Sequence, residues 1–187
     1  MKETYLIAIT PPADIQKRIK TAQTQYHKTG PYHLPPHVTI YPPFNSTLPL
    51  ADIAKLLKRQ LATLRTQQLT WDSYGSFEGK NNVFYFKPDT KSTKFLKSVF
   101  IKTLRALTGH VSDAQNGYAT AHHDYHPHIT IAEHLSMKAL ADIKLQTKKI
   151  TRPLCFFAKR VDIYQRDPNS KTYTKVRHVL LQKTNTH

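Results

Sequence analysis

Cysteine, glycine and acidic residues are all scarce in this chain of 187 residues. The single cysteine, Cys155, cannot form an internal disulfide, and it excludes a zinc site made of four cysteines. A reducing compartment suits such a chain. Five glycines stand beside twelve prolines, which excludes collagen-like and low-complexity classes. The 39% of hydrophobic residues is typical of a globular protein with its own core.

Long apolar runs are missing as well. The first one, from Tyr5 to Ile9, is followed by Thr10 and two prolines. It is too short for the apolar part of a signal peptide and far too short to cross a bilayer. We interpret it as a first strand, and we expect a cytoplasmic protein with no membrane partner.

The scarcity of acidic residues leaves the chain strongly basic. Twelve Asp and Glu oppose 28 Lys and Arg, which gives a net charge of +16, and eleven histidines can add to it below neutral pH. Such a balance favours a polyanionic partner, nucleic acid first, although solubility alone would also explain it. The sequence has no G-x-x-x-x-G-K-[ST] loop and no G-x-G-x-x-G after a strand, so we expect no nucleotide cofactor.

Apolar and β-branched runs alternate with helical patterns along the chain. The helical patterns cover residues 13–26, 50–64, 90–107 and 137–146, with Ser136 as an N-cap and Gly109 after the third helix. The strand patterns cover residues 5–9, 37–41, 69–77, 83–86, 128–131, 154–164 and 173–181. Tight pairs such as SFEGKNNVFYF indicate hairpins. We therefore expect an α+β fold with antiparallel sheets rather than a doubly wound parallel sheet.

Two strand segments repeat one pattern. Pro-His-Val-Thr-Ile begins at Pro36 and Pro-His-Ile-Thr-Ile begins at Pro127. Side chains alternate along a strand, so in each copy the histidine and the threonine share one face while the aliphatic residues face a core. Each strand thus carries an imidazole and a hydroxyl about 6 to 7 Å apart.

These four side chains supply the groups for phosphodiester chemistry without a metal, provided that the two strands lie together. One neutral imidazole can accept a proton from the attacking oxygen while the other, as imidazolium, protonates the leaving oxygen. The threonine hydroxyls can donate hydrogen bonds to the non-bridging phosphate oxygens. The sequence makes His37 and His128 the candidate catalytic pair and Thr39 and Thr130 the candidate phosphate ligands.

The duplicated H-x-T pattern resembles that of the 2H phosphoesterase superfamily, which contains the 2'-5' RNA ligases and the RNA 2',3'-cyclic phosphodiesterases. HVTIYPPF is similar to its first motif, LTWDSYGSFEGKNNVFYFKP to its middle hairpin, and FLKSVFIKTLRALTG followed by HPHITI to the helix and second motif. Order and spacing agree over about residues 4 to 182.

The resemblance implies a bilobal α+β fold with two pseudo-symmetric antiparallel sheets flanked by helices and a central cleft. Residues 1–187 would form this single domain, with one lobe built from both chain ends and the other from the middle. The implied activity is metal-independent hydrolysis of 2',3'-cyclic phosphates on RNA ends or nucleotides, with reverse 2'-5' ligation as a further activity. We expect a monomer that needs no cofactor.

Two other function classes are consistent with the residues. A basic RNA-binding module would need phosphate donors but not two titrating groups. A metal-assisted phosphohydrolase could use the run His122-His123-Asp124-Tyr125-His126, because imidazole and carboxylate suit zinc, nickel or iron.

Three further residues are candidate substrate contacts. His126 precedes His128 by two residues and faces the same way if the strand begins early. Tyr41 continues the face of His37 and can stack on a nucleobase, although packing in the core is an equal alternative. Arg177, in an alternating series with Tyr173 and Lys175, can bind a phosphate as a fork, or can lie on an exposed sheet face.

Overall fold

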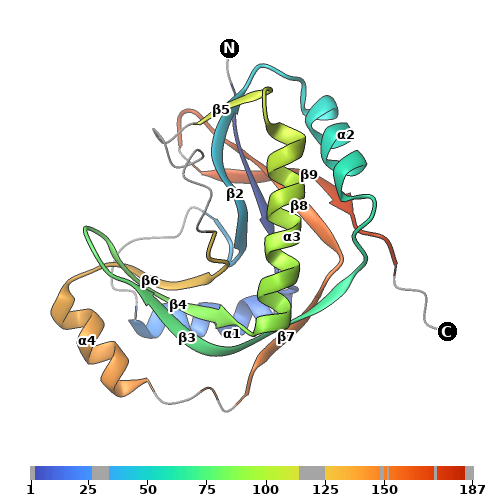
Figure 1. The fold of residues 1–187 in the computed structure, drawn as a ribbon. Helices are drawn as coiled ribbons and strands as arrows, with labels where there is room; N and C mark the ends of the chain where they lie inside the picture. The colour runs from blue at the N-terminus through green and yellow to red at the C-terminus, as the bar shows by residue number, and fades with distance from the viewer. Residues whose placement is uncertain are drawn as a thin grey trace.

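Two antiparallel sheets form the framework of the molecule (Figure 1). The computed structural model describes residues 3–26, 34–113, 125–147, 150, 152–170 and 172–183. The five-stranded sheet has the order β5-β2-β1-β8-β9 and the four-stranded sheet the order β6-β4-β3-β7. The strands are β1 (Glu3–Ile9), β2 (Val38–Ser46), β3 (Gln67–Phe77), β4 (Asn82–Pro88), β5 (Val111–Asp113), β6 (Ile129–Leu135), β7 (Leu154–Ala158), β8 (Arg160–Arg166) and β9 (Tyr173–Leu180).

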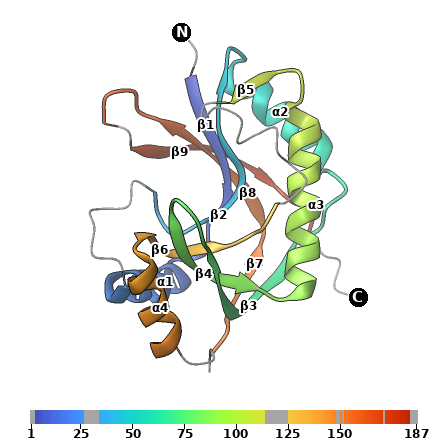
Figure 2. The ribbon, with the colours of Figure 1, turned by 60° about the vertical axis from the view of Figure 1, so that its left-hand side comes forward.

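Helices cover the sheets on two sides (Figure 2). The helices are α1 (Ala13–Tyr26), α2 (Leu50–Leu61), α3 (Thr90–Leu107) and α4 (Met137–Gln146). α2 packs against α3 and β9, and α3 also contacts β2 and β3. α1 contacts β6 and β7, while α4 contacts β4 and β6. The predicted α+β architecture with antiparallel sheets is confirmed.

One continuous core draws residues from both sheets. Val38 and Ile40 of β2 and Ile129 and Ile131 of β6 are completely buried in it. Because side chains alternate along a strand, the faces that carry the histidine and threonine of each motif point away from this core. On the five-stranded sheet, that other face holds a small apolar cluster made of Leu6, Ala8 and Tyr164, packed against Leu34 and Tyr173.

The helix ends follow the local sequence. Asp89 caps α3 by accepting a hydrogen bond from the backbone N–H of Ser92 at 2.6 Å. Ser136 caps α4 by accepting from Ala139 at 3.1 Å, as predicted. Gly109 follows α3 with φ of 80°, the left-handed conformation for which glycine is favoured. α2 ends at Leu61, three residues before the predicted end.

Several strand predictions were wrong in extent; β6, for example, continues four residues beyond its predicted end at Ile131. The predicted single strand over residues 154–164 divides at Lys159 into β7 and β8, which belong to different sheets. β2 continues through Pro42 and Pro43 to Ser46, beyond the predicted end at Tyr41. The pairing of β2 with β1 shifts between Tyr41 and Phe44, so the two prolines, which lack N–H donors, lie in an irregular part of the ladder. β5 was not predicted.

Within the ranges given above, no helix combines the length and the apolar character that a transmembrane span requires.

Candidate active site

The two motif histidines hold the same local position in the two sheets. His37 immediately precedes β2 and His128 immediately precedes β6. Nδ1 of His37 lies 2.8 Å from the carbonyl oxygen of Pro35, and Nδ1 of His128 lies 2.8 Å from that of His126. A carbonyl oxygen can only accept, so in each ring Nδ1 carries the proton and donates it. Nε2 is therefore left as the nitrogen that can accept or deliver a proton.

Burial controls the protonation of both rings. It lowers the pKa of His37 below the ordinary value of 6.5, and the charge of His128 lowers it further, against an opposing effect of the Pro35 carbonyl. Burial also lowers the pKa of His128; the carbonyl of His126 and the charge of Glu133 oppose this, while the charge of His126 adds to it. The repulsion between His37 and His128 means that the two rings are close enough to interact. The folded chain thus brings the two motifs together.

The backbone carbonyl of each motif threonine accepts a hydrogen bond from a distant side chain, and the side chain of Thr39 also contacts His37. Oγ1 of Thr39 lies 3.2 Å from Nε2 of His37, so in the neutral state the hydroxyl can donate to the ring. The hydroxyl of Tyr125 donates to the carbonyl oxygen of Thr39 at 2.7 Å, and the side-chain amide of Gln23 donates to that of Thr130 at 2.9 Å. Each motif strand is held at its outer edge by a side chain from elsewhere in the chain.

Tyr125 joins the segment before the second motif to the strand of the first motif. Its ring stacks on Phe100 of α3, with ring centroids 4.4 Å apart and an interplanar angle of 12°. Burial raises its pKa, so the hydroxyl remains a donor at all working pH values. In the sequence, Tyr125 is only one member of a histidine-rich run, because a contact over 86 residues leaves no local signal.

Two aromatic rings of the middle hairpin surround His128. Phe77 meets it edge-on with ring centroids 5.0 Å apart, and Tyr85 lies 5.2 Å away at a tilted angle. The two rings also contact each other at 4.5 Å. Gly75, which pairs with Tyr85 across the hairpin, leaves room for this ring, because a Cβ atom there would lie 2.5 to 2.7 Å from three of its atoms. The hairpin therefore positions the imidazole of the second motif.

Two of the predicted substrate contacts differ in exposure. His126 is exposed, lies near Phe77 with ring centroids 6.2 Å apart, and is close enough to His128 to affect its pKa. Its role as a substrate contact stays a prediction. Tyr41 is only 4% exposed and packs edge-on against Phe44 in the main core. Tyr41 is thus a core residue, which was one of its two interpretations, and too little of its ring is exposed for a nucleobase to stack on it.

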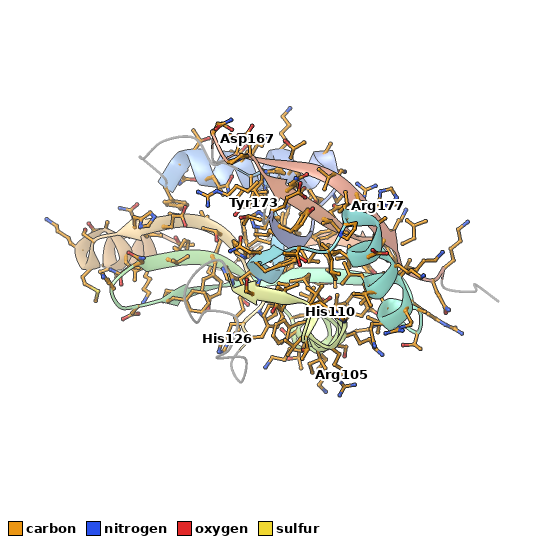
Figure 3. All side chains as sticks on the ribbon, turned by 90° about the horizontal axis from the view of Figure 1, so that it is seen from above. Arg105, His110, His126, Asp167, Tyr173 and Arg177 are labelled. Carbon is orange, nitrogen blue, oxygen red and sulfur yellow. The ribbon has the colours of Figure 1, made fainter. Side chains whose placement is uncertain are left out.

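Arg177 lies on the opposite face of its sheet. It pairs with Ile163, whose side chain is in the main core, and it lines a hollow beside α2 together with Lys55 and Lys58. Figure 3 shows it next to this helix. The pairing of β8 and β9 shifts between Lys175 and Arg177, which breaks the expected alternation. Of the two interpretations of Arg177, a phosphate-binding residue in the groove or a residue on an exposed sheet face, this placement favours the exposed sheet face.

The metal-site alternative depends on residues that the structure does not describe. His122, His123 and Asp124 lie outside the described ranges. Among the residues placed by the structure, no group of three or more His, Cys, Asp or Glu side chains is arranged to hold a metal ion.

Comparisons with known proteins agree with this arrangement. A model of the 2'-5' RNA ligase superfamily matches residues 11–170. A protein of Staphylococcus aureus (strain Newman), provisionally named a phosphoesterase, is 26% identical over 138 residues, which cover 73% of this chain and 75% of that protein.

Solved structures share the fold at low sequence identity. A protein structure from Thermus thermophilus superposes with a TM-score of 0.65 at 15% identity, over 98% of this chain and 99% of that one. E. coli LigT complexed with 3'-AMP gives 0.58 at 16% identity, over 97% and 99%. The two H-x-T motifs, the common position of their histidines directly before β2 and β6, and the family match over most of the sequence lead to one conclusion: the chain belongs to the 2'-5' RNA ligase superfamily, whose members are 2H phosphoesterases.

Proposed function

We propose that this protein is a metal-independent phosphodiesterase that opens 2',3'-cyclic phosphates at RNA ends or on nucleotides. The observation that carries the proposal is the matched orientation of His37 and His128, each of which donates Nδ1–H to a backbone carbonyl at 2.8 Å. This matched orientation leaves two equivalent Nε2 atoms, one to remove a proton and one to supply a proton.

In the proposed reaction, Nε2 of one neutral histidine accepts a proton from water as its oxygen attacks phosphorus. The opposite phosphorus–ribose oxygen bond breaks, and the second histidine gives its Nε2 proton to the departing oxygen. Thr39 and Thr130 donate hydrogen bonds to the non-bridging oxygens and keep the phosphorus between the rings. One phosphomonoester and one ribose hydroxyl result. When a ribose hydroxyl of a second strand takes the place of water, the same attack on phosphorus breaks the same phosphorus–oxygen bond and joins the two strands through a new phosphodiester.

The substrate class rests on charge and on the relatives. The net charge of +16 suits a polyanion. E. coli LigT, which shares the fold, is described in complexes with 3'-AMP, NADP+ and ATP. We propose a nucleotide or RNA substrate for this chain on the same grounds. A monomeric, cytoplasmic enzyme remains our expectation.

The test is hydrolysis of a nucleoside 2',3'-cyclic phosphate by the wild type, His37→Ala, His128→Ala and the double variant. Each single change should lower kcat by about 10² to 10⁴ fold, and the double variant should lose little more, because acid and base act in one transition state. His110→Ala, at an exposed histidine after α3, is the matched control and should keep full activity.

Two results would contradict the proposal. One is wild-type turnover in a folded single variant, which would remove that histidine from the mechanism. The other is binding of RNA by the wild type with no turnover of any cyclic phosphate, which would make the protein an RNA-binding module.

A further inference from the structure

A completely buried carboxylate, Asp162, lies on the same sheet face as the first motif. Ala8 of β1 pairs with Thr39 of β2 on one side and with Asp162 of β8 on the other, so the three side chains form one row across the sheet. Adjacent strands are about 4.8 Å apart, which puts Asp162 roughly 10 Å from Thr39. The residue between them is Ala8, whose side chain is a single methyl group.

Asp162 has an unusual environment for a buried acid. It is 0% exposed, and neither of its carboxylate oxygens accepts a hydrogen bond from the described residues. Two cations lie beside it instead: Nε of Arg160 is 3.0 Å from Oδ1 and Nζ of Lys175 is 4.0 Å from it. A buried charge without such partners would be strongly destabilising. The buried carboxylate of Asp162 therefore fixes the side chains of Arg160 and Lys175 on this face of the sheet.

The two cations remain accessible to a ligand. The side chains of Arg160 and Lys175 are 43% and 41% exposed, although the carboxylate that they flank is buried. Arg160 approaches Asp162 through Nε, so the two terminal nitrogens of its guanidinium are the outer part of the group. A guanidinium edge matches two oxygens of a phosphate.

The register also aligns Arg160 with the candidate catalytic histidine. When the pairing of β1 is continued by one residue toward β2 and by two residues toward β8, Thr10 lies between His37 and Arg160. Thr10 is itself fixed there by a hydrogen bond of 2.7 Å between its hydroxyl and that of Tyr164. The row places Arg160 two strands from His37, again roughly 10 Å away.

We propose that Arg160 and Lys175, held by Asp162, form a second phosphate subsite that binds the neighbouring phosphate of an RNA strand whose cyclic end lies at His37 and His128. This inference rests on the proposed function, because it assumes that the reacting phosphate lies between the histidines. It makes a short RNA a better substrate than a mononucleotide. Asp162 acts as a positioning residue, and the two cations make the contact.

The experiment compares two substrates: a nucleoside 2',3'-cyclic phosphate, and a trinucleotide that ends in the same group and carries internal phosphates. For wild type, KM should be lower for the trinucleotide. Arg160→Gln and Lys175→Gln should each raise KM for the trinucleotide about tenfold and leave kcat on both substrates within twofold. Each should also reduce the slope of log affinity against log salt by about one. Asp162→Asn, if folded, should raise the same KM.

Arg177→Gln is the matched control, since it removes a cation two residues from Lys175 but on the opposite sheet face. It should leave both substrates unchanged. The subsite is refuted if wild type has equal KM for the two substrates, or if Arg177→Gln changes KM as much as Arg160→Gln does. Absence of mononucleotide turnover in wild type would instead refute the proposed function, so the two failures are distinguishable.

Discussion

Gly75→Ala tests whether the aromatic hairpin positions His128. The Cβ of an alanine at this position would lie 2.5, 2.6 and 2.7 Å from Cε2, Cζ and Oη of Tyr85. Ordinary contacts between such atoms are about 3.5 to 4.0 Å. The Tyr85 ring must therefore move by about 1 Å, and it is 8% exposed, with Phe77 and His128 in contact with it.

Two effects of different size should follow. Crowding in a packed region costs about 1 to 3 kcal/mol in the free energy of unfolding. A displacement of about 1 Å passed on to a catalytic group costs on the order of 100-fold in rate. We therefore expect Gly75→Ala to lower kcat on a cyclic phosphate by 10- to 100-fold, while the protein still folds.

The assay combines steady-state kinetics with thermal unfolding. Ser76→Ala, at the next position of β3 and on the other face of the hairpin, is the control and should keep the wild-type kcat. Replacing Tyr85 with Leu in the Gly75→Ala background removes the crowding and should recover stability but not kcat. A folded Gly75→Ala variant with kcat within twofold of wild type would refute the idea that Tyr85 fixes the position of the imidazole.

Other predictions follow from the same site. Because burial lowers the pKa of both histidines below 6.5 and one of them must be protonated, kcat/KM should be bell-shaped against pH with its maximum below 6.5; a maximum above pH 7 would contradict this. Because the pKa values of His37 and His128 are lower in the folded chain, the unfolded chain binds more protons below pH 6.5. The contribution of the two neutral rings to the free energy of unfolding is therefore complete above pH 6.5 and is lost as the pH falls. His128→Gln should flatten this loss when the free energy of unfolding is measured by urea titration. Activity should survive EDTA; loss on chelation with recovery on adding zinc would favour the His122–Asp124 run. Tyr125→Phe should lower the free energy of unfolding by about 1 to 3 kcal/mol, because it leaves the Thr39 carbonyl unsatisfied, as thermal unfolding can measure.

The secondary structure was predictable because local patterns determine it. α1, α3 and α4 have the predicted bounds, since amphipathic spacing and the cap at Ser136 act within a few residues. The break at Lys159 was not predictable in the same way. Strand-forming residues stand on both sides of it, Phe156 and Phe157 before and Val161 and Ile163 after, and only the sheet to which each half pairs distinguishes β7 from β8.

The four motif residues were predictable for a different reason: the chain contains the same pattern twice, and alternation along a strand assigns each side chain to a face. Residues that support the site were not predictable, because their contacts join distant segments. Gln23 reaches Thr130 across 107 residues. The face on which Arg177 lies was not predictable either, because one irregularity in the pairing of β8 and β9 reverses the side chains that follow it on the strand.

The site has a common logic in both halves of the molecule. Each imidazole donates a hydrogen bond from Nδ1–H to the carbonyl oxygen two residues earlier, and burial lowers its pKa, so the free protein favours two neutral rings. Acid–base catalysis needs one of them charged. A bound phosphate supplies the missing stabilisation, because a negative charge next to an imidazole raises its pKa. In the reaction that we propose, the substrate itself brings about the protonation that its cleavage requires, while the charge of His128, which lowers the pKa of His37, opposes protonation of both rings.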